Sequence, residues 1–152
     1  MFTATLAANY SHVWSGDPAL DTSKDSGLDL KLFHATGYRK HLPCKTGMEP
    51  MVWELQHLRG DDAACARGLA SKAVDDVEYA DMALKQIASL ALMGVENALI
   101  DGEPFEIRRG LHRKSRTMRV TDDCMATIYA VSVLVNDLGN RVIEEDLAGD
   151  PT

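Results

Sequence analysis

The sequence predicts one acidic α+β domain, in which an N-terminal β-hairpin or small antiparallel sheet packs against about three α-helices. Three observations support this fold class. The chain has 152 residues, the usual length of one domain, and 45% of them are apolar, which is enough to form a core. Strand-like alternation also gives way to helix-like spacing along the chain. We expect a polar leader over residues 1–27, whose mobility is left open, a single domain over residues 28–147 and a short tail over residues 148–152.

Two alternating runs predict the sheet. Leucines alternate with other residues at the start of residues 28–42, which is the period of two of a half-buried strand. Residues 51–56 repeat this pattern around Trp53. The turn-rich segment between the two runs predicts that they form a hairpin with a long loop. For Trp53 we favour core packing over a role as an interface anchor, and Trp14 is the other candidate anchor.

Two helices are predicted to follow these strands. The first spans residues 62–74, with Asp61 as its N-cap. The second begins after Asp75 or Asp76, and its apolar residues recur at three- and four-residue steps as far as Leu99. The IDGEP segment that follows is expected to end this helix, because glycine and proline interrupt helical structure.

A third helix is predicted near the end of the domain. Thr121 is its expected N-cap, and its apolar spacing continues through Gly139 to Val142. The β-branched residues in this region leave a strand as the alternative for residues 122–135.

Charge is distributed unevenly along the chain. The formal net charge of −7 disfavours nucleic-acid binding. Residues 105–120 nevertheless hold six basic residues and one acid, a net charge of +5, and residues 121–152 have a net charge of −6. The basic segment has three interpretations: a solvated loop or hairpin, a docking surface for an acidic protein or for the chain's own acidic tail, or a nucleic-acid patch. The candidate partner-binding residues are Arg108, Arg109, Arg113, Lys114 and Arg116.

Groups of residues that resemble chemical sites have better structural explanations. Glu54 and His57 show the E-x-x-H spacing of metal-binding helices, but in a strand this spacing places them on opposite faces. His34, His41 and Cys44 lack a fourth zinc ligand at a recognised spacing. We therefore expect no metal, no cofactor and no catalytic residue.

The cysteines and the apolar segments indicate the compartment. Cys44, Cys65 and Cys124 are an odd number at wide spacings, which is typical of free thiols in the cytoplasm. Neither Cys65 nor Cys124 has the surroundings of a thiol nucleophile. Residues 1–17 lack the features of a signal peptide, and no apolar stretch reaches the roughly 20 residues that span a membrane.

Three phrases of the sequence follow one another in a characteristic order: MVWELQHLRGDDAACARG, GVENALIDGEP and NDLGNRVIEEDL. This order resembles that of the small tail assembly chaperones, and of related accessory proteins, from the tail modules of long-tailed bacteriophages. The resemblance covers roughly residues 28–147. It implies a protein of the host cytoplasm, without cofactor or catalytic residue, that holds the long helical tape measure protein while tail tube subunits polymerise around it.

Several functions remain open at the level of the sequence. The alternatives to a tail assembly chaperone are a small phage protein that inhibits a host protein and a permanent head–tail or tail component of the virion, and a small enzyme ranks last. The oligomeric state is not readable. Methionines can adapt to varied partner helices, although at helical spacing they more often belong to a core. The methionines in question are Met82, Met93, Met118 and Met125.

Overall fold

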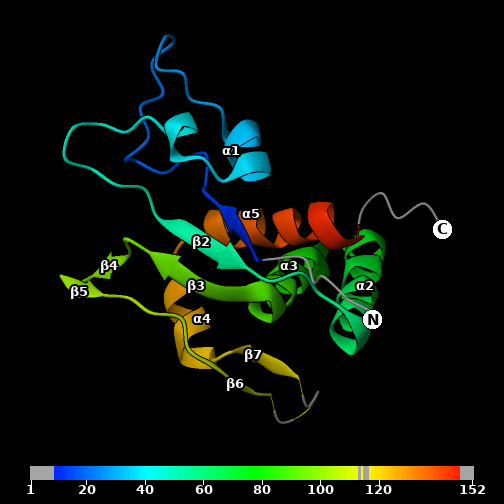
Figure 1. Ribbon diagram of the computed structural model, residues 1–152. Helices are drawn as coiled ribbons and strands as arrows, with labels where there is room; N and C mark the ends of the chain where they lie inside the picture. The colour runs from blue at the N-terminus through cyan, green and yellow to red at the C-terminus, as the bar shows by residue number, and fades with distance from the viewer. Residues whose placement is uncertain (1–8, 113, 115–116, 148–152) are drawn as a thin grey trace, which may run out of the picture.

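The computed structural model describes residues 9–112, 114 and 117–147, and it confirms the α+β class. Strands β1 (Tyr10–His12), β2 (Val52–Leu55) and β3 (Leu92–Glu96) form an antiparallel sheet in the order β1-β2-β3 (Figure 1). The helices are α1 (Leu30–Thr36), α2 (Gly60–Asp75), α3 (Val77–Ala91), α4 (Asp122–Ile128) and α5 (Ser132–Val142). The remaining elements are the 3₁₀ turn η1 (Arg39–His41), the π-helical turn η2 (Ile143–Leu147), and the strands β4 (Leu99–Ile100), β5 (Glu103–Pro104), β6 (Arg109–Leu111) and β7 (Met118–Val120).

The central strand β2 contributes side chains to two cores. Trp53 and Leu55 belong to the main core, which the helices α2 to α5 line. Val52 belongs to a second, smaller core that includes Phe33 of α1 and Leu20 of the N-terminal loop. Successive side chains of a strand point to opposite faces, so one short strand can join both cores. Trp53 is only 2% exposed, and its predicted place in the core is confirmed.

The predicted strand within residues 28–42 is wrong, and so is its hairpin with residues 51–56. The segment instead contains α1, which begins where the Asp29 side chain accepts a hydrogen bond from the Leu32 N–H and ends at Gly37 with a φ of 75°. Phe33 is the buried residue of α1, whereas Leu32 is 42% exposed. The alternating leucines therefore do not mark a buried strand face, and β2 pairs with β1 and β3 instead.

The expected leader, residues 1–27, contributes to the fold in its described part, residues 9–27. This part includes β1, which pairs with β2. Val13 and Leu20 are almost completely buried in the smaller core. Residues 1–8 and the expected tail, residues 148–152, lie outside the described residues.

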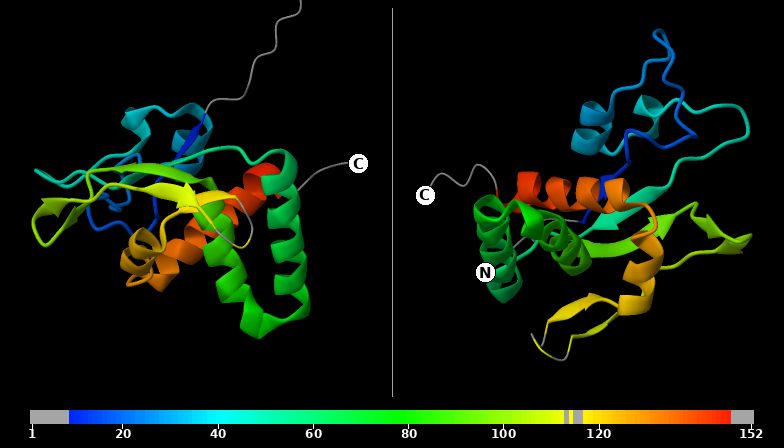
Figure 2. Two further views of the ribbon diagram at one scale, coloured as in Figure 1. Left: turned by 90° about the horizontal axis from the view of Figure 1, so that it is seen from below. Right: turned by 180° about the vertical axis from the view of Figure 1, so that it is seen from behind.

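The first two predicted helices are present as α2 and α3. Arg59 is the N-cap of α2, whereas the predicted cap, Asp61, lies within the first turn of the helix. Asp76, one of the two residues predicted to begin this helix, is the N-cap of α3, because its side chain accepts a hydrogen bond from the Glu78 N–H. These two helices pack against each other as an antiparallel pair, which projects from the rest of the molecule in the left view of Figure 2.

The predicted extension of the second helix to Leu99 is wrong. The helix α3 ends at Ala91, and the next residue begins β3. The IDGEP segment forms the β4–β5 hairpin rather than a helix end. Its two turn residues, Asp101 and Gly102, have φ values of 52° and 81°. Two positive φ values are typical of the type I′ turn, whose twist suits two-residue hairpins.

The final predicted helix forms as two helices. Thr121 caps α4 as predicted, because its hydroxyl accepts a hydrogen bond from the Cys124 N–H. The helix α4 ends at Ile128, and α5 begins after a short turn. The strand alternative for residues 122–135 is therefore wrong. The helix α5 passes very close to α3 at Gly139, where an added Cβ would lie 2.6 Å from the carbonyl oxygen of Leu84.

Candidate partner-binding site

The basic segment forms a β-hairpin, one of the structures expected for it. The strands β6 and β7 pair antiparallel, with Arg109 opposite Val120 and Leu111 opposite Met118. The base of the hairpin is fixed to the start of α4, because the Thr121 N–H donates a 2.8 Å hydrogen bond to the carbonyl oxygen of Arg108. The hairpin is thus held at the point where it leaves the main core.

Arg109 anchors this hairpin to the end of α3. Its guanidinium donates hydrogen bonds to the carbonyl oxygens of Leu92 at 2.6 Å, Leu90 at 3.0 Å and Ser89 at 3.3 Å, and to that of Met118 at 2.9 Å. The last carbonyls of a helix lack partners within the helix, and a cation is favoured beside them. Burial lowers the pKa of Arg109 from its ordinary value. Arg109 is one of the predicted partner-binding residues. Its guanidinium instead donates hydrogen bonds to backbone carbonyls of its own chain.

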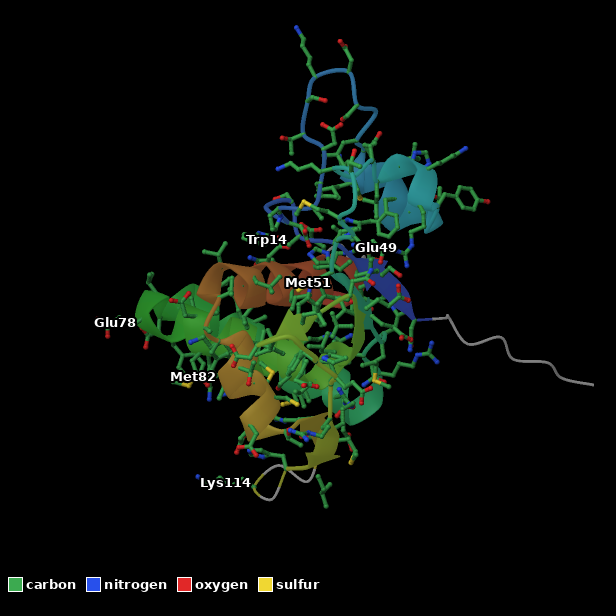
Figure 3. The ribbon with its side chains drawn as sticks, turned by 90° about the vertical axis from the view of Figure 1, so that its left-hand side faces the viewer. Trp14, Glu49, Met51, Glu78, Met82 and Lys114 are labelled. Atoms are coloured by element: carbon green, nitrogen blue, oxygen red, sulfur yellow. The ribbon has the colours of Figure 1, made fainter. Side chains whose placement is uncertain are left out.

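The remaining basic residues divide into buried and exposed ones. Arg119 is only 9% exposed, and its Nε donates a 2.7 Å hydrogen bond to the Thr117 hydroxyl. Arg108 and Lys114 are exposed, and Figure 3 shows Lys114 at the outer end of the hairpin. The two other predicted partner-binding residues, Arg113 and Arg116, lie outside the described residues.

An exposed apolar pair lies between these cations. Leu111 is 64% exposed and Met118 is 50% exposed, and the two residues stand directly opposite each other on β6 and β7. Directly opposed residues in an antiparallel pair place their side chains on the same face. The hairpin therefore presents two large apolar side chains to solvent, from a base that Arg109 holds in place. The charge pattern of the sequence marks the cations of this segment but not Leu111, whose place opposite Met118 follows from the register of β6 and β7.

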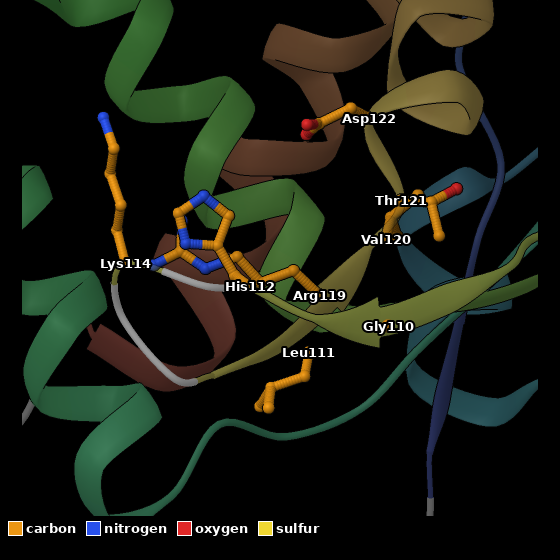
Figure 4. Close-up of a pocket in the computed structure, with 8 residues that line it drawn as sticks. All are labelled: Gly110, Leu111, His112, Lys114, Arg119, Val120, Thr121 and Asp122. Carbon is orange, nitrogen blue, oxygen red and sulfur yellow. The ribbon is translucent and has the colours of Figure 1, made fainter.

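A hollow of about 490 Å³ lies beside this apolar pair (Figure 4). The Arg119 side chain lies on the opposite side of the hairpin from Leu111, as the strand register requires. Nitrogen-bearing side chains and one carboxylate line the hollow, so it suits a polar or acidic side chain better than an apolar ligand. The lining residues are Gly110, Leu111, His112, Lys114, Arg119, Val120, Thr121 and Asp122.

The residue groups tested for chemistry do not come together as sites. Glu54 accepts a hydrogen bond from Asn9, whereas His57 pairs with Asp146, so the E-x-x-H spacing does not unite its two residues. The ring of His34 stacks on the ring of His12. Across the described ranges, no three His, Cys, Asp or Glu side chains are placed to hold a metal ion. The cysteines are free, as expected from their number.

Two histidine–aspartate pairs join the N-terminal part of the chain to its end. His12 and Asp137 are hydrogen-bonded at 2.5 Å, and His57 and Asp146 at 2.7 Å. The first pair is 125 residues apart and the second 89 residues apart. Arg141 lies between them and donates a 3.4 Å hydrogen bond to Nδ1 of His12. No local spacing could reveal these pairs, and their partly buried positions between distant segments indicate a structural role.

His34, beside this cluster, makes stability depend on pH. Its Nε2 accepts a 3.2 Å hydrogen bond from the Val13 N–H, and burial together with nearby Arg141 lowers its pKa to about 4. Between pH 4 and 6.5 His34 is protonated in the unfolded chain but neutral in the folded protein. The free energy of unfolding should therefore fall as the pH is lowered through this window, by up to about 1.4 kcal/mol per pH unit from this group.

Chemical denaturation over this pH range checks the prediction. A His34→Asn variant should show a shallower pH dependence of the free energy of unfolding than the original chain. Equal slopes for the original chain and His34→Asn would contradict the assignment.

Comparison with protein-family models, curated proteins and solved structures gives no match to this chain. Within the described parts of the chain, none of the helices is both long and apolar enough to cross a membrane.

Proposed function

We propose that this chain is an accessory assembly protein that acts by binding other proteins, and specifically that it serves as a phage tail assembly chaperone. The observation that carries the proposal is the exposed pair Leu111 and Met118, presented by a hairpin that also carries exposed Arg108 and Lys114. Apolar side chains supply binding energy, and the surrounding cations select for a partner of opposite charge. An amphipathic helix with acidic residues fits both features.

The resemblance of the sequence to tail assembly chaperones supplies the specific partner. A tape measure protein is long and helical, so a chaperone needs a surface that recognises helices reversibly. The methionines differ in their availability for this task. Met118 and Met82 are each 50% exposed, whereas Met125 is buried in the main core. Met118 is thus the methionine that lies at the proposed site and also remains open to solvent.

Co-purification with a tape measure protein tests the proposal. The tagged chain is expressed in cells that also produce the tape measure protein of the same tail module. The original chain should capture that protein, and a Leu111→Ser/Met118→Ser variant should bind it with roughly tenfold lower affinity, which corresponds to about 1.4 kcal/mol. Met82→Ser changes an equally exposed methionine on α3 and is the matched control.

Three other outcomes would contradict the proposal, and two of them point to a different function. Capture of a host enzyme in place of the tape measure protein would contradict the chaperone role and favour an inhibitor. Presence of the chain in purified mature particles would instead favour a virion component. Equal capture by the original chain and the hairpin variant would remove the hairpin from the binding surface.

The exposed cations should contribute a salt-dependent part of this affinity. Replacing Arg108 and Lys114 with serine should weaken partner binding roughly threefold to tenfold in low salt, because exposed ion pairs each contribute about 0.2–1 kcal/mol. The difference in affinity between the original chain and this variant should shrink in high salt, because dissolved ions screen the attraction between the two cations and an acidic partner. Arg109 is left in place because its guanidinium bonds the end of α3. A loss of affinity that is the same at every salt concentration would contradict the electrostatic explanation.

A further inference from the structure

The turn between α2 and α3 carries the most exposed large apolar residues of the described chain. Val74 is 82% exposed and Val77 is 85% exposed. Three acids, Asp75, Asp76 and Glu78, lie in the same five-residue stretch, which contains no basic residue. The left view of Figure 2 shows this end of the helix pair projecting away from the rest of the molecule. We call residues 74–78 the acidic corner.

The acidic corner and the β6–β7 hairpin are complementary in both charge and apolar character. Each presents two exposed apolar side chains, Val74 and Val77 in the corner and Leu111 and Met118 in the hairpin. The corner carries three acids, whereas the hairpin carries the exposed cations Arg108 and Lys114. Surfaces that match in this way attract each other and also bury apolar area on contact.

The two surfaces lie at opposite ends of α3. Arg109 fixes the hairpin to the carbonyls of Ser89, Leu90 and Leu92, at the end of this helix, whereas Val77 is its first residue. A helix of this length spans roughly 20 Å. Figure 3 likewise shows Glu78 and Lys114 at separate edges of the molecule. The corner of one molecule is therefore placed to meet the hairpin of another molecule.

We propose that the acidic corner of one copy docks on the basic hairpin of a second copy, so that the chain self-associates head to tail. A contact between two different surfaces leaves one of each surface free at the ends of every assembly. It therefore builds open chains or closed rings rather than a simple symmetric dimer. If the proposed function holds, a second copy and the partner helix compete for the same hairpin, and partner binding dissolves the self-assembly.

The chain alone, without a partner, is sufficient for the test. Light scattering and sedimentation velocity should show concentration-dependent assemblies of the original chain in low salt, which dissociate in high salt. A corner variant, Val74→Ser/Val77→Ser, and a hairpin variant, Leu111→Ser/Met118→Ser, should each weaken self-association by about tenfold or more. All four side chains are at least half exposed, so the variants should retain the original circular dichroism spectrum.

Mixing the two variants gives the decisive result. The intact hairpin of the corner variant can bind the intact corner of the hairpin variant, and both remaining surfaces are then mutated. The mixture should therefore form heterodimers and nothing larger. Charge reversal gives a second route: Lys114→Glu should weaken self-association, and mixing with Asp75→Lys should restore a heterodimer.

Several outcomes would overturn the proposal. These are a monomeric original chain at all concentrations in low salt, a corner variant that associates as the original chain does, or a mixture of variants that stays monomeric. Loss of association in Leu99→Ser alone would assign the contact to the β4–β5 hairpin, where Leu99 is 69% exposed. Failure of this test leaves capture of the tape measure protein unaffected, because that capture needs the hairpin but not the corner.

Discussion

Replacing Arg109 with glutamine should lower the free energy of unfolding by about 3 kcal/mol, whereas the same change at the neighbouring Arg108 should alter it by less than about 0.5 kcal/mol. The Arg109 guanidinium bonds three carbonyl oxygens at the end of α3 and one on β7. A shorter side chain leaves several of these acceptors without partners. The Arg108 side chain is exposed, and the hydrogen bond of its backbone N–H to Cys124 survives the substitution.

Urea denaturation of the two glutamine variants and of Arg109→Lys measures this difference. The lysine variant keeps the charge but loses the planar group that reaches several carbonyls at once, so its stability should fall between those of the original chain and Arg109→Gln. Equal stabilities for the Arg108 and Arg109 variants would show that the carbonyl contacts of Arg109 do not hold the hairpin to α3.

Adding one methyl group at Gly139 should destabilise the protein by about 2–3 kcal/mol, whereas the same addition at Gly68 should stabilise it by up to about 1 kcal/mol. Both glycines lie within helices. At Gly139 a Cβ would lie 2.6 Å from the backbone oxygen of Leu84, so α5 and α3 must move apart. At Gly68 nothing lies within 4 Å of the new atom, and only the gain in helix propensity remains.

Thermal and chemical denaturation of Gly139→Ala and Gly68→Ala check the opposite signs. Because the close neighbour of Gly139 is a backbone atom, a compensating Leu84→Ala change should not restore stability. Stabilisation by both alanine substitutions would contradict the close approach of α3 and α5.

Some elements could be predicted from the sequence because their signals are local. Asp76 and Thr121 are followed by helical spacing, and both cap the expected helices. The alternation around Trp53 likewise marks a real strand. The alternating leucines after residue 28 mislead because the cap at Asp29 and the turn at Gly37 both favour a helix, in which Phe33 rather than a row of leucines is buried.

Other features depend on contacts between distant residues. The end of α3 at Ala91 is stabilised by Arg109, whose guanidinium bonds carbonyls 17 to 20 residues earlier in the chain. The same limit applies to the candidate site. Net charge identifies the basic segment, but it cannot distinguish Arg109, which turns inward, from Arg108, which faces solvent. The exposure of Val74 and Val77 similarly follows from how α2 and α3 meet rather than from their apolar character.

The bond between His12 and Asp137 also constrains the order in which a newly made chain can finish folding. β1 is made before α5, because Asp137 of α5 follows His12 by 125 residues. At roughly 5–20 residues per second, this interval lasts on the order of 6–25 seconds. The helix pair α2–α3 joins neighbouring segments and can form as it emerges, and β1 can pair with β2 before α5 has been made. During translation His12 is therefore without its Asp137 partner for this interval, and β1 can be joined to α5 only after α5 has been made.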